Sequence, residues 1–312
     1  MKISRLRRSM DFEKEVKWEE VDRQRAEFYE KNGYSKSDNL YLELEMDSPY
    51  VNAHEDYSRT VDVVQLHSHT FHEILFCRSG NVQYMLGTER YRLQRGDVVV
   101  APAGVSHQPL FLEKMVEPYR RYVVWVSKNF VDIFGTMCDN SLEMISGARL
   151  VRTAGTPWEK EMEGIFRKCC KEDLMQRPGY KAALCGEAMV LLVELSRAFA
   201  SVQPVSQEKP ELIDEVTAYI ENHLEDKITL EQTARRFLVS KSTVSHLFSQ
   251  KLGVSFYRWV TRRRLIAAKN LIQEGRAMED VFEEVGFRDY TTFYKAFKKE
   301  YGISPSQYKG ML

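Results

Sequence analysis

The sequence is short of three features: patterned cysteines, a long apolar run and a net charge. Its five cysteines are an odd set without a CxxC pair, which fits reduced, mostly buried thiols in a cytoplasmic protein. No apolar stretch approaches the roughly 18 residues that cross a bilayer. The charged N-terminus also lacks the apolar centre of a secretory signal. We therefore expect a cytoplasmic protein with no membrane partner.

The net charge is zero, with 45 basic and 45 acidic residues, but the charges are unevenly distributed. Residues 227–276 hold eleven basic and two acidic side chains, a surplus of nine. Residues 208–226, just upstream, hold seven acidic side chains and one lysine. A local basic block indicates a polyanion as partner, although a solvated helix face would give the same pattern.

The chain has 312 residues, is 43% apolar and is long enough for two folded domains. Between residues 60 and 127, β-branched or aromatic runs alternate with turn sequences such as "SGN" and "RGD", which predicts a small barrel or sandwich. From about residue 156 the period is helical, and one helix carries an apolar stripe that fits either a core or a dimer seam: Leu184, Ala188, Leu191, Leu195 and Phe199. The predicted divisions are an N-terminal arm and helix at 1–59, a β-barrel at 60–127, a helical dimerisation or connecting region at 128–200, a linker at 201–211 and a helical domain at 212–312.

An internal repeat organises the helical domain. The stretches "LVSKSTVSHLFSQKLGVSFYRW" and "FRDYTTFYKAFKKEYGISPSQY" align at an offset of 49 residues, which pairs Phe248 with Phe297 and Gly253 with Gly302. In each copy a polar cap, Ser240 or Asp289, starts a helix that the glycine ends. The repeat predicts two helix-turn-helix units joined by a long helix over residues 255–274.

This domain resembles the AraC family of bacterial transcription regulators. The stretch "VGFRDYTTFYKAFKKEYGISPSQY" is similar to the family's second-unit signature, including the Gly-Phe pair and the closing Gly-x-x-Pro-x-x-Tyr. The resemblance covers residues 212–310 and implies binding to double-stranded DNA. A helix fits the major groove, where its outward polar side chains read base edges, and two joined units enter adjacent groove segments.

The resemblance implies a set of DNA contacts on the two outward helix faces. Base contacts by resemblance fall on Ser242, Ser245, His246, Tyr290, Thr291 and Lys295, with Lys241 near the start of the first helix. Phosphate contacts, which set affinity without reading sequence, suit Arg262, Arg263, Arg264, Lys298 and Lys299.

Three of the seven histidines lie in the stretch "HSHTFHE", residues 67–73. On an extended strand His67, His69 and Glu73 share one face because their positions have the same parity. His107 follows 34 residues after Glu73. Three imidazoles and one carboxylate form a suitable ligand set for a divalent transition metal.

The same stretch resembles the first motif of the cupin superfamily, a small β-barrel, and "GDVVVAPAGVSH" resembles the second. The N-terminal domains of the AraC family are commonly cupin-like and bind small effectors, often without a metal. Three readings of the four side chains therefore stay open: an effector pocket, a metal site and a structural cluster. The predicted fold class is α+β and multidomain, with a cupin-like β-barrel plus helices followed by an all-α domain with two helix-turn-helix units.

The sequence thus predicts a sequence-specific DNA-binding regulator, not an enzyme, whose cupin-like domain senses a small-molecule effector. We expect it to act as a homodimer. The effector-binding residues are predicted as His67, His69, Glu73 and His107, which are also the predicted ligands of any metal cofactor. A metal-dependent cupin enzyme or a metal sensor, fused to the DNA-binding domain, is the alternative.

Overall fold

The computed structural model describes residues 46–58, 64–111, 117–137, 147, 149–202, 205 and 210–310. Most of the predicted N-terminal arm and most of the 201–211 linker lie outside the described residues. We call residues 46–202 the β half and residues 210–310 the helical half. Among the described helices, none is long and apolar enough to span a membrane.

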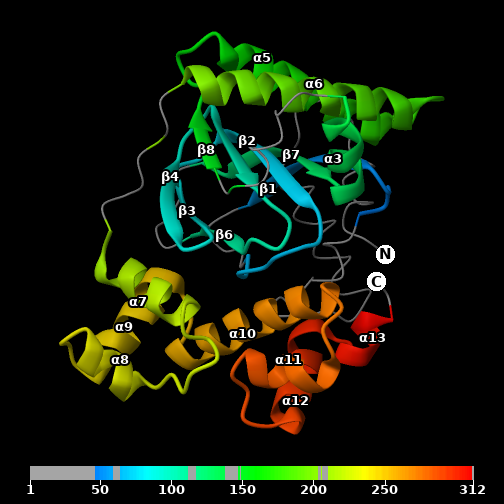
Figure 1. Cartoon of the computed structure of the whole chain (residues 1–312). Coiled ribbons are helices and arrows are strands. Elements are labelled where there is room, and N and C mark those ends of the chain that lie inside the picture. Colours follow the sequence, from blue (N-terminus) through cyan, green and yellow to red (C-terminus); the bar gives the residue numbers. More distant parts are fainter. Residues whose placement is uncertain are drawn as a thin grey trace, which may run out of the picture.

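The β half contains two antiparallel sheets (Figure 1). Five strands make the larger sheet, in the order β1 (Val51–Ser58), β7 (Tyr119–Val126), β2 (His72–Ser79), β5 (Asp97–Ala101) and β8 (Arg149–Arg152). Three strands make the smaller sheet, in the order β4 (Glu89–Leu93), β3 (Val82–Leu86) and β6 (His107–Leu110). The β-rich fold agrees with the sequence prediction, but the hydrogen-bonded ladders of the described strands do not close into one barrel.

Alternation along β2 explains how the larger sheet buries both faces. Leu75 and Cys77 point toward the smaller sheet and pack against Tyr84 of β3. Ile74 and Phe76 point the other way, against helices. Both faces are apolar because each one is covered, which is why β2 and β5 read as nearly continuous apolar runs.

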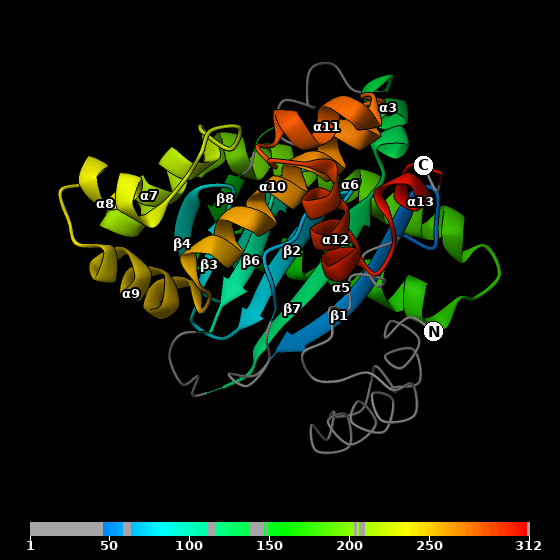
Figure 2. The same ribbon diagram turned by 90° about the horizontal axis from the view of Figure 1, so that it is seen from below.

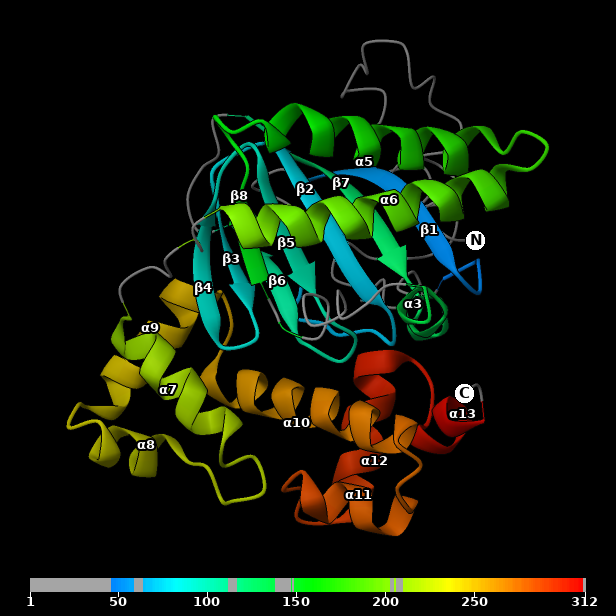
Figure 3. The same ribbon diagram turned by 45° about the horizontal axis from the view of Figure 1, so that its top comes forward.

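Three helices cover that second face: α3 (Lys128–Gly135), α5 (Trp158–Met175) and α6 (Tyr180–Ser201). Figure 3 shows α5 and α6 side by side across the larger sheet. In the predicted stripe of α6, Leu184, Leu191 and Leu195 are 0–2% exposed and belong to this core. The stripe is therefore core within one chain, and any dimer contact of α6 must use other residues.

The helical half consists of short helices around one long one. Its elements are α7 (Leu212–Glu221), α8 (Leu230–Arg236), α9 (Lys241–Leu252), α10 (Phe256–Gln273), α11 (Met278–Glu284), α12 (Tyr290–Tyr301) and α13 (Pro305–Lys309). Figure 2 shows α7 to α9 at one end of α10 and α11 to α13 at the other. The predicted long helix and the two helix-turn-helix units are confirmed.

The repeat also predicts the helix ends correctly. Ser240 caps α9 by accepting a hydrogen bond from the Thr243 amide at 3.0 Å, and Asp289 caps α12 by accepting one from the Thr292 amide at 2.8 Å. Gly253 ends α9 in a left-handed conformation with a φ of 68°, which glycine adopts without the steric penalty of a side chain.

Candidate functional site

The histidine stretch enters the fold as a loop that leads into a strand. β2 begins only at His72, so His67 and His69 do not lie on the extended strand that the parity argument assumed. His67 instead forms an isolated bridge with His107, with N–H···O distances of 2.9 and 3.3 Å. The carbonyl of His69 accepts a hydrogen bond from the Gly104 amide at 2.8 Å. These backbone contacts bring the two sequence motifs together without the parity of a strand.

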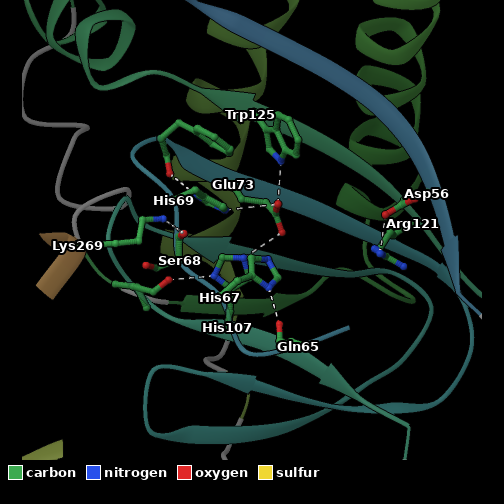
Figure 4. A network of polar contacts seen from close by, with 12 residues as sticks. Asp56, Gln65, His67, Ser68, His69, Glu73, His107, Arg121, Trp125 and Lys269 are labelled. Carbon is green, nitrogen blue, oxygen red and sulfur yellow. Dashed lines mark hydrogen bonds and ion pairs between the residues drawn. The ribbon is translucent and has the colours of Figure 1, made fainter. Parts of the chain in front are cut away.

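The four predicted side chains converge at one point between the sheets (Figure 4). Ligand atoms of His67, His69 and His107 all lie within 4.8 Å of one another, and all three residues are buried. A carboxylate oxygen of Glu73 lies 3.6 Å from His69 Nε2, and the other lies 3.5 Å from His107 Nε2. We call these four residues the histidine cluster.

Hydrogen bonds on the far side of each ring fix which nitrogen faces the cluster. The Nδ1 atoms of His67, His69 and His107 lie 2.8, 2.7 and 3.0 Å from the carbonyl oxygens of Gln65, Phe71 and Val105. A nitrogen that bonds a carbonyl must carry the proton, so in the neutral ring Nε2 is left with a lone pair. Metal-bound histidines commonly have this arrangement, because the outer bond orients the ring.

Burial controls the charge of these groups. Burial lowers the pKa of His67 to about 3, with a further contribution from His107, and burial also lowers the pKa of His69. Burial alone would raise the pKa of Glu73, but its contacts with His107 and His69 lower it well below its usual range. At neutral pH, therefore, neutral rings of His67 and His69 stand beside a carboxylate.

The cluster offers acceptors and almost no donors. The Nε2 atoms of His69 and His107 are buried and make no hydrogen bond with any described group. An unsatisfied buried polar atom costs about 1–3 kcal/mol, so a purely structural role would leave the cluster in an unfavourable state. Three imidazole nitrogens and a carboxylate fit a divalent transition metal, and they also fit a small molecule rich in hydroxyl or amine donors.

Two aromatic residues complete the cluster. Trp125 donates a hydrogen bond from Nε1 to Glu73 at 2.8 Å, and the Phe71 ring stacks on His69 with centroids 3.9 Å apart. Sequence reasoning considered Trp125 as a wall of an effector pocket but left it out of the predicted site, because strand parity alone does not fix its direction, and it gave no role to Phe71. Trp125 lies opposite Glu73 in the β2–β7 ladder, so its role depends on strand register that spacing along the chain does not reveal.

The predicted base-reading residues lie on the outer faces of two helices. Lys241, Ser242, Ser245 and His246 are exposed on α9, and Tyr290, Thr291 and Lys295 are exposed on α12 together with Lys298 and Lys299. These positions remain predictions for DNA contact, and their exposure is compatible with it.

The three arginines of α10 are placed differently. Arg263 is 6% exposed and donates to Glu221 from Nε at 2.6 Å, so the structure does not support its predicted phosphate contact. Arg262 is 3% exposed and pairs with Glu300 at 2.8 Å. Arg264 donates to the Leu224 carbonyl at 3.0 Å. Part of the basic surplus is thus neutralised inside the chain, which sequence counting alone could not detect.

Comparisons with known proteins agree with this two-part architecture. Residues 233–311 match a helix-turn-helix domain family, and residues 61–114 match the cupin domain family. The HTH-type transcriptional activator RhaR of Escherichia coli O139:H28 is 23% identical over 249 residues, which cover 80% of this chain and 88% of the relative. The probable transcriptional regulator LumQ of Photobacterium leiognathi is 34% identical over 92 residues, or 29% of this chain and 37% of the relative.

Among solved structures, the C-terminal domain of AraT, a response regulator from Geobacillus stearothermophilus, is 30% identical. It covers 33% of this chain and 87% of its own, with a TM-score of 0.32. The two domain matches and the regulators among the relatives identify a DNA-binding regulator rather than an enzyme. This chain is a transcriptional regulator of the AraC type, with a cupin domain followed by a helix-turn-helix DNA-binding domain.

Proposed function

We propose that this regulator senses a small effector at the histidine cluster. The observation that carries the proposal is the convergence of buried acceptors: the Nε2 atoms of His69 and His107 face the Glu73 carboxylate without hydrogen-bond partners among the described residues. An occupant must therefore bring donors or positive charge. A polyhydroxylated molecule or an amine meets this requirement, and a divalent transition metal is the second occupant that the donor set supports.

The histidine cluster would hold such a metal through His67, His69, His107 and Glu73. The imidazole and carboxylate lone pairs that face one another would bind the metal, and its positive charge would offset their mutual repulsion. The residues around the cluster would orient it, because three backbone carbonyls hold the imidazole rings and Trp125 holds the carboxylate.

The DNA interface in this proposal consists of the exposed faces of α9 and α12. Its base-reading residues are Lys241, Ser242, Ser245, His246, Tyr290, Thr291 and Lys295, and Lys298 contacts phosphate. Their exposure and their equivalent positions in the two units support the assignment. Arg263 is left out because it is buried against Glu221.

The regulator acts in the cytoplasm as a homodimer, with its domains divided at the predicted boundaries. On α6 the buried stripe is used by the sheet, but Val190 is 46% exposed. A second copy would bury this side chain, so Val190 is the position at which we expect a dimer contact.

The decisive experiment combines metal content with ligand-dependent stability, on untagged protein purified without chelators. A double variant, His67→Ala with His107→Ala, is compared with His223→Ala, which removes a histidine outside the cluster, in the turn that follows α7. One ion per chain, lost only in the double variant, supports the metal occupant.

If no ion is found, the effector-pocket proposal predicts that a polyol or amine raises the Tm of the wild type and of the His223 variant, but not that of the double variant. A ligand at 100 times its Kd adds about 2.7 kcal/mol to the free energy of unfolding. The proposal fails if no ion is found and no ligand distinguishes the double variant from the wild type.

A further inference from the structure

The helix that joins the two DNA-binding units is hydrogen-bonded to the two loops that hold the three histidines of the histidine cluster. These loops are residues 65–69 and 102–107. Four side chains of α10 each donate to one of these loops: Arg262 to the Gln65 side chain, Arg263 to Ser106 Oγ, Lys269 to the Ser68 carbonyl at 3.4 Å and Asn270 to the Gly104 carbonyl at 3.2 Å. Figure 4 shows Lys269 and Ser68 directly beside the cluster. The helix therefore contacts the backbone supports of the histidines.

Two of these side chains are bridges with a second partner in the helical half. Arg262 holds Gln65 and also donates to Glu300 of α12 at 2.8 Å. Arg263 holds Ser106 and also donates from Nε to Glu221 of α7 at 2.6 Å. Each arginine therefore joins one histidine loop to the end of one particular helix, α12 in the second unit or α7 beside the first.

Burial makes both bridges costly to break. Arg262 is 3% exposed and Arg263 is 6% exposed, so neither guanidinium can exchange its partners for water without moving. The loop also approaches α10 closely at Gly104, which has a φ of 84°. A Cβ there would lie 3.4 Å from the Asn270 amide nitrogen. The loops and α10 thus form a packed interface.

The loop acceptors are connected to the imidazoles by short paths. The carbonyl of Gln65 accepts the Nδ1 hydrogen bond of His67 at 2.8 Å. Ser106 is the neighbour of His107, and His107 is paired with His67 through the isolated bridge. A shift of the rings toward an occupant therefore pulls on both acceptors at once.

We propose that the Arg262 and Arg263 bridges are the regulatory connection through which the histidine cluster sets the arrangement of the two helix-turn-helix units. This inference rests on the proposed effector site for its biological trigger, but the connection itself is testable without any effector. An occupant acts through the bridges only by favouring one loop arrangement over another. The outer faces of α9 and α12 are exposed in the bridged arrangement, so we expect this arrangement to bind DNA and its loss to weaken binding.

The test breaks the bridges from the loop side. The double variant Gln65→Ala, Ser106→Ala removes both acceptors but leaves the Arg262–Glu300 and Arg263–Glu221 pairs in place. The matched control, Gln94→Ala with Ser79→Ala, removes the same side-chain types from β-half positions outside the two loops, where Ser79 Oγ donates to the Pro118 carbonyl. A second variant, Arg262→Lys with Arg263→Lys, keeps the positive charges but cannot hold two partners in a fixed fork.

The measured quantity is the Kd for a duplex that the wild-type chain selects from a random-sequence pool, at one stated salt concentration. We expect both bridge variants to weaken binding by at least fivefold, within the roughly 5- to 150-fold range of ordinary coupling between sites. The control should bind like the wild type. Hydrogen exchange of the core strands checks that every variant remains folded.

Combining the cluster variant with the bridge variants then tests whether the bridges transmit a signal or only hold the two halves together. The test is whether the effects of the variants on the Kd are additive. The cluster variant His69→Gln, His107→Gln should change the Kd in the wild-type and control backgrounds but not in the bridge-variant backgrounds, because the connection is already cut. Additive effects would overturn the inference, as would a cluster variant with no effect in the wild type. Failure of the proposed effector site would give a different result. No ion and no ligand would bind, whatever the combined cluster and bridge variants show.

Discussion

The two helix-turn-helix units share one plan but differ in what completes their cores. Val244 and Phe248 of the first unit and Phe293 and Phe297 of the second occupy equivalent positions, and all four are fully buried. The apolar cluster of the first unit continues into the β half through Leu66, Met85 and Leu110. Among the described residues, the cluster of the second unit is built from the helical half alone, including Leu265, Val281, Phe287 and Tyr301.

This difference means that the units meet the β half through different forces. The first unit shares apolar packing with it, and its neighbour α7 is also held by Arg90, which donates to Asp214 at 2.6 and 2.9 Å. The second unit is connected through α10 and the polar bridge of Arg262. The first unit is held by many packed side chains, whereas the second unit depends on α10 and the polar bridge, so we expect the second unit to be the one that changes position when its bridge is lost.

The largest effect should come from removing the central phenylalanine of each unit. Phe248→Ala and Phe297→Ala should each cost about 3–5 kcal/mol of stability, because both side chains are fully buried. The two variants should differ in how far the loss of hydrogen-exchange protection spreads. The Phe297 variant should lose protection only within the helical half, over residues 265–308, and the Phe248 variant should lose it in the first unit and also at β3 and β6. Equal spreading in both variants would contradict the separation of the two cores.

A smaller effect should follow from truncating the shared core on its β side. Met85 of β3 is fully buried within the cluster of the first unit, and Met85→Ala should cost about 2–5 kcal/mol. The exchange of α9 should rise while that of α12 stays unchanged. Met162→Ala is the matched control, because Met162 is equally buried but packs in the cluster beneath α5 and α6. A control that loosens α9 as much as Met85→Ala would show that the effect is global.

Local patterns predicted the helical half well. The caps at Ser240 and Asp289, the terminal glycines and the long helix are all decided within a few residues of sequence, where periodicity and capping chemistry act. The identity of the histidine cluster also followed from local motifs. The DNA contacts, the occupant of the cluster and the domain boundaries stay predictions.

Long-range docking could not be predicted from these patterns. Arg262 meets Gln65 across 197 residues, and Arg263 meets Ser106 across 157 residues. An arginine run in a basic block reads as a phosphate-binding surface when its acidic partners are unknown. The parity argument for His67, His69 and Glu73 did not hold for a related reason, since the backbone at His67 pairs with His107 instead of extending β2.

The helix caps provide a comparison in which the two units should behave alike. Ser240→Ala and Asp289→Ala should each cost about 1 kcal/mol, because each removes the acceptor of one helix-terminal N–H group. Neither cap contacts the β half, so the shared core should not matter. Chemical denaturation of the two variants measures the loss. A difference above about 1 kcal/mol between them would mean that the β half also stabilises the start of α9.

The smallest effect on stability should accompany a clear effect on DNA binding. Lys298 is exposed near the end of α12, where the equivalent residue of the first unit is Ser249. Lys298→Ala should change the free energy of unfolding by less than about 0.5 kcal/mol, because an exposed side chain adds little packing. If Lys298 contacts phosphate, its loss should reduce the slope of log K against log salt by about 0.9, since one fewer counterion is released. Ser249→Ala should leave the slope unchanged. Equal slopes for the Lys298 variant and the wild type would instead mean that the second unit binds DNA without this charge, and that its affinity comes from the groove-facing residues of α12.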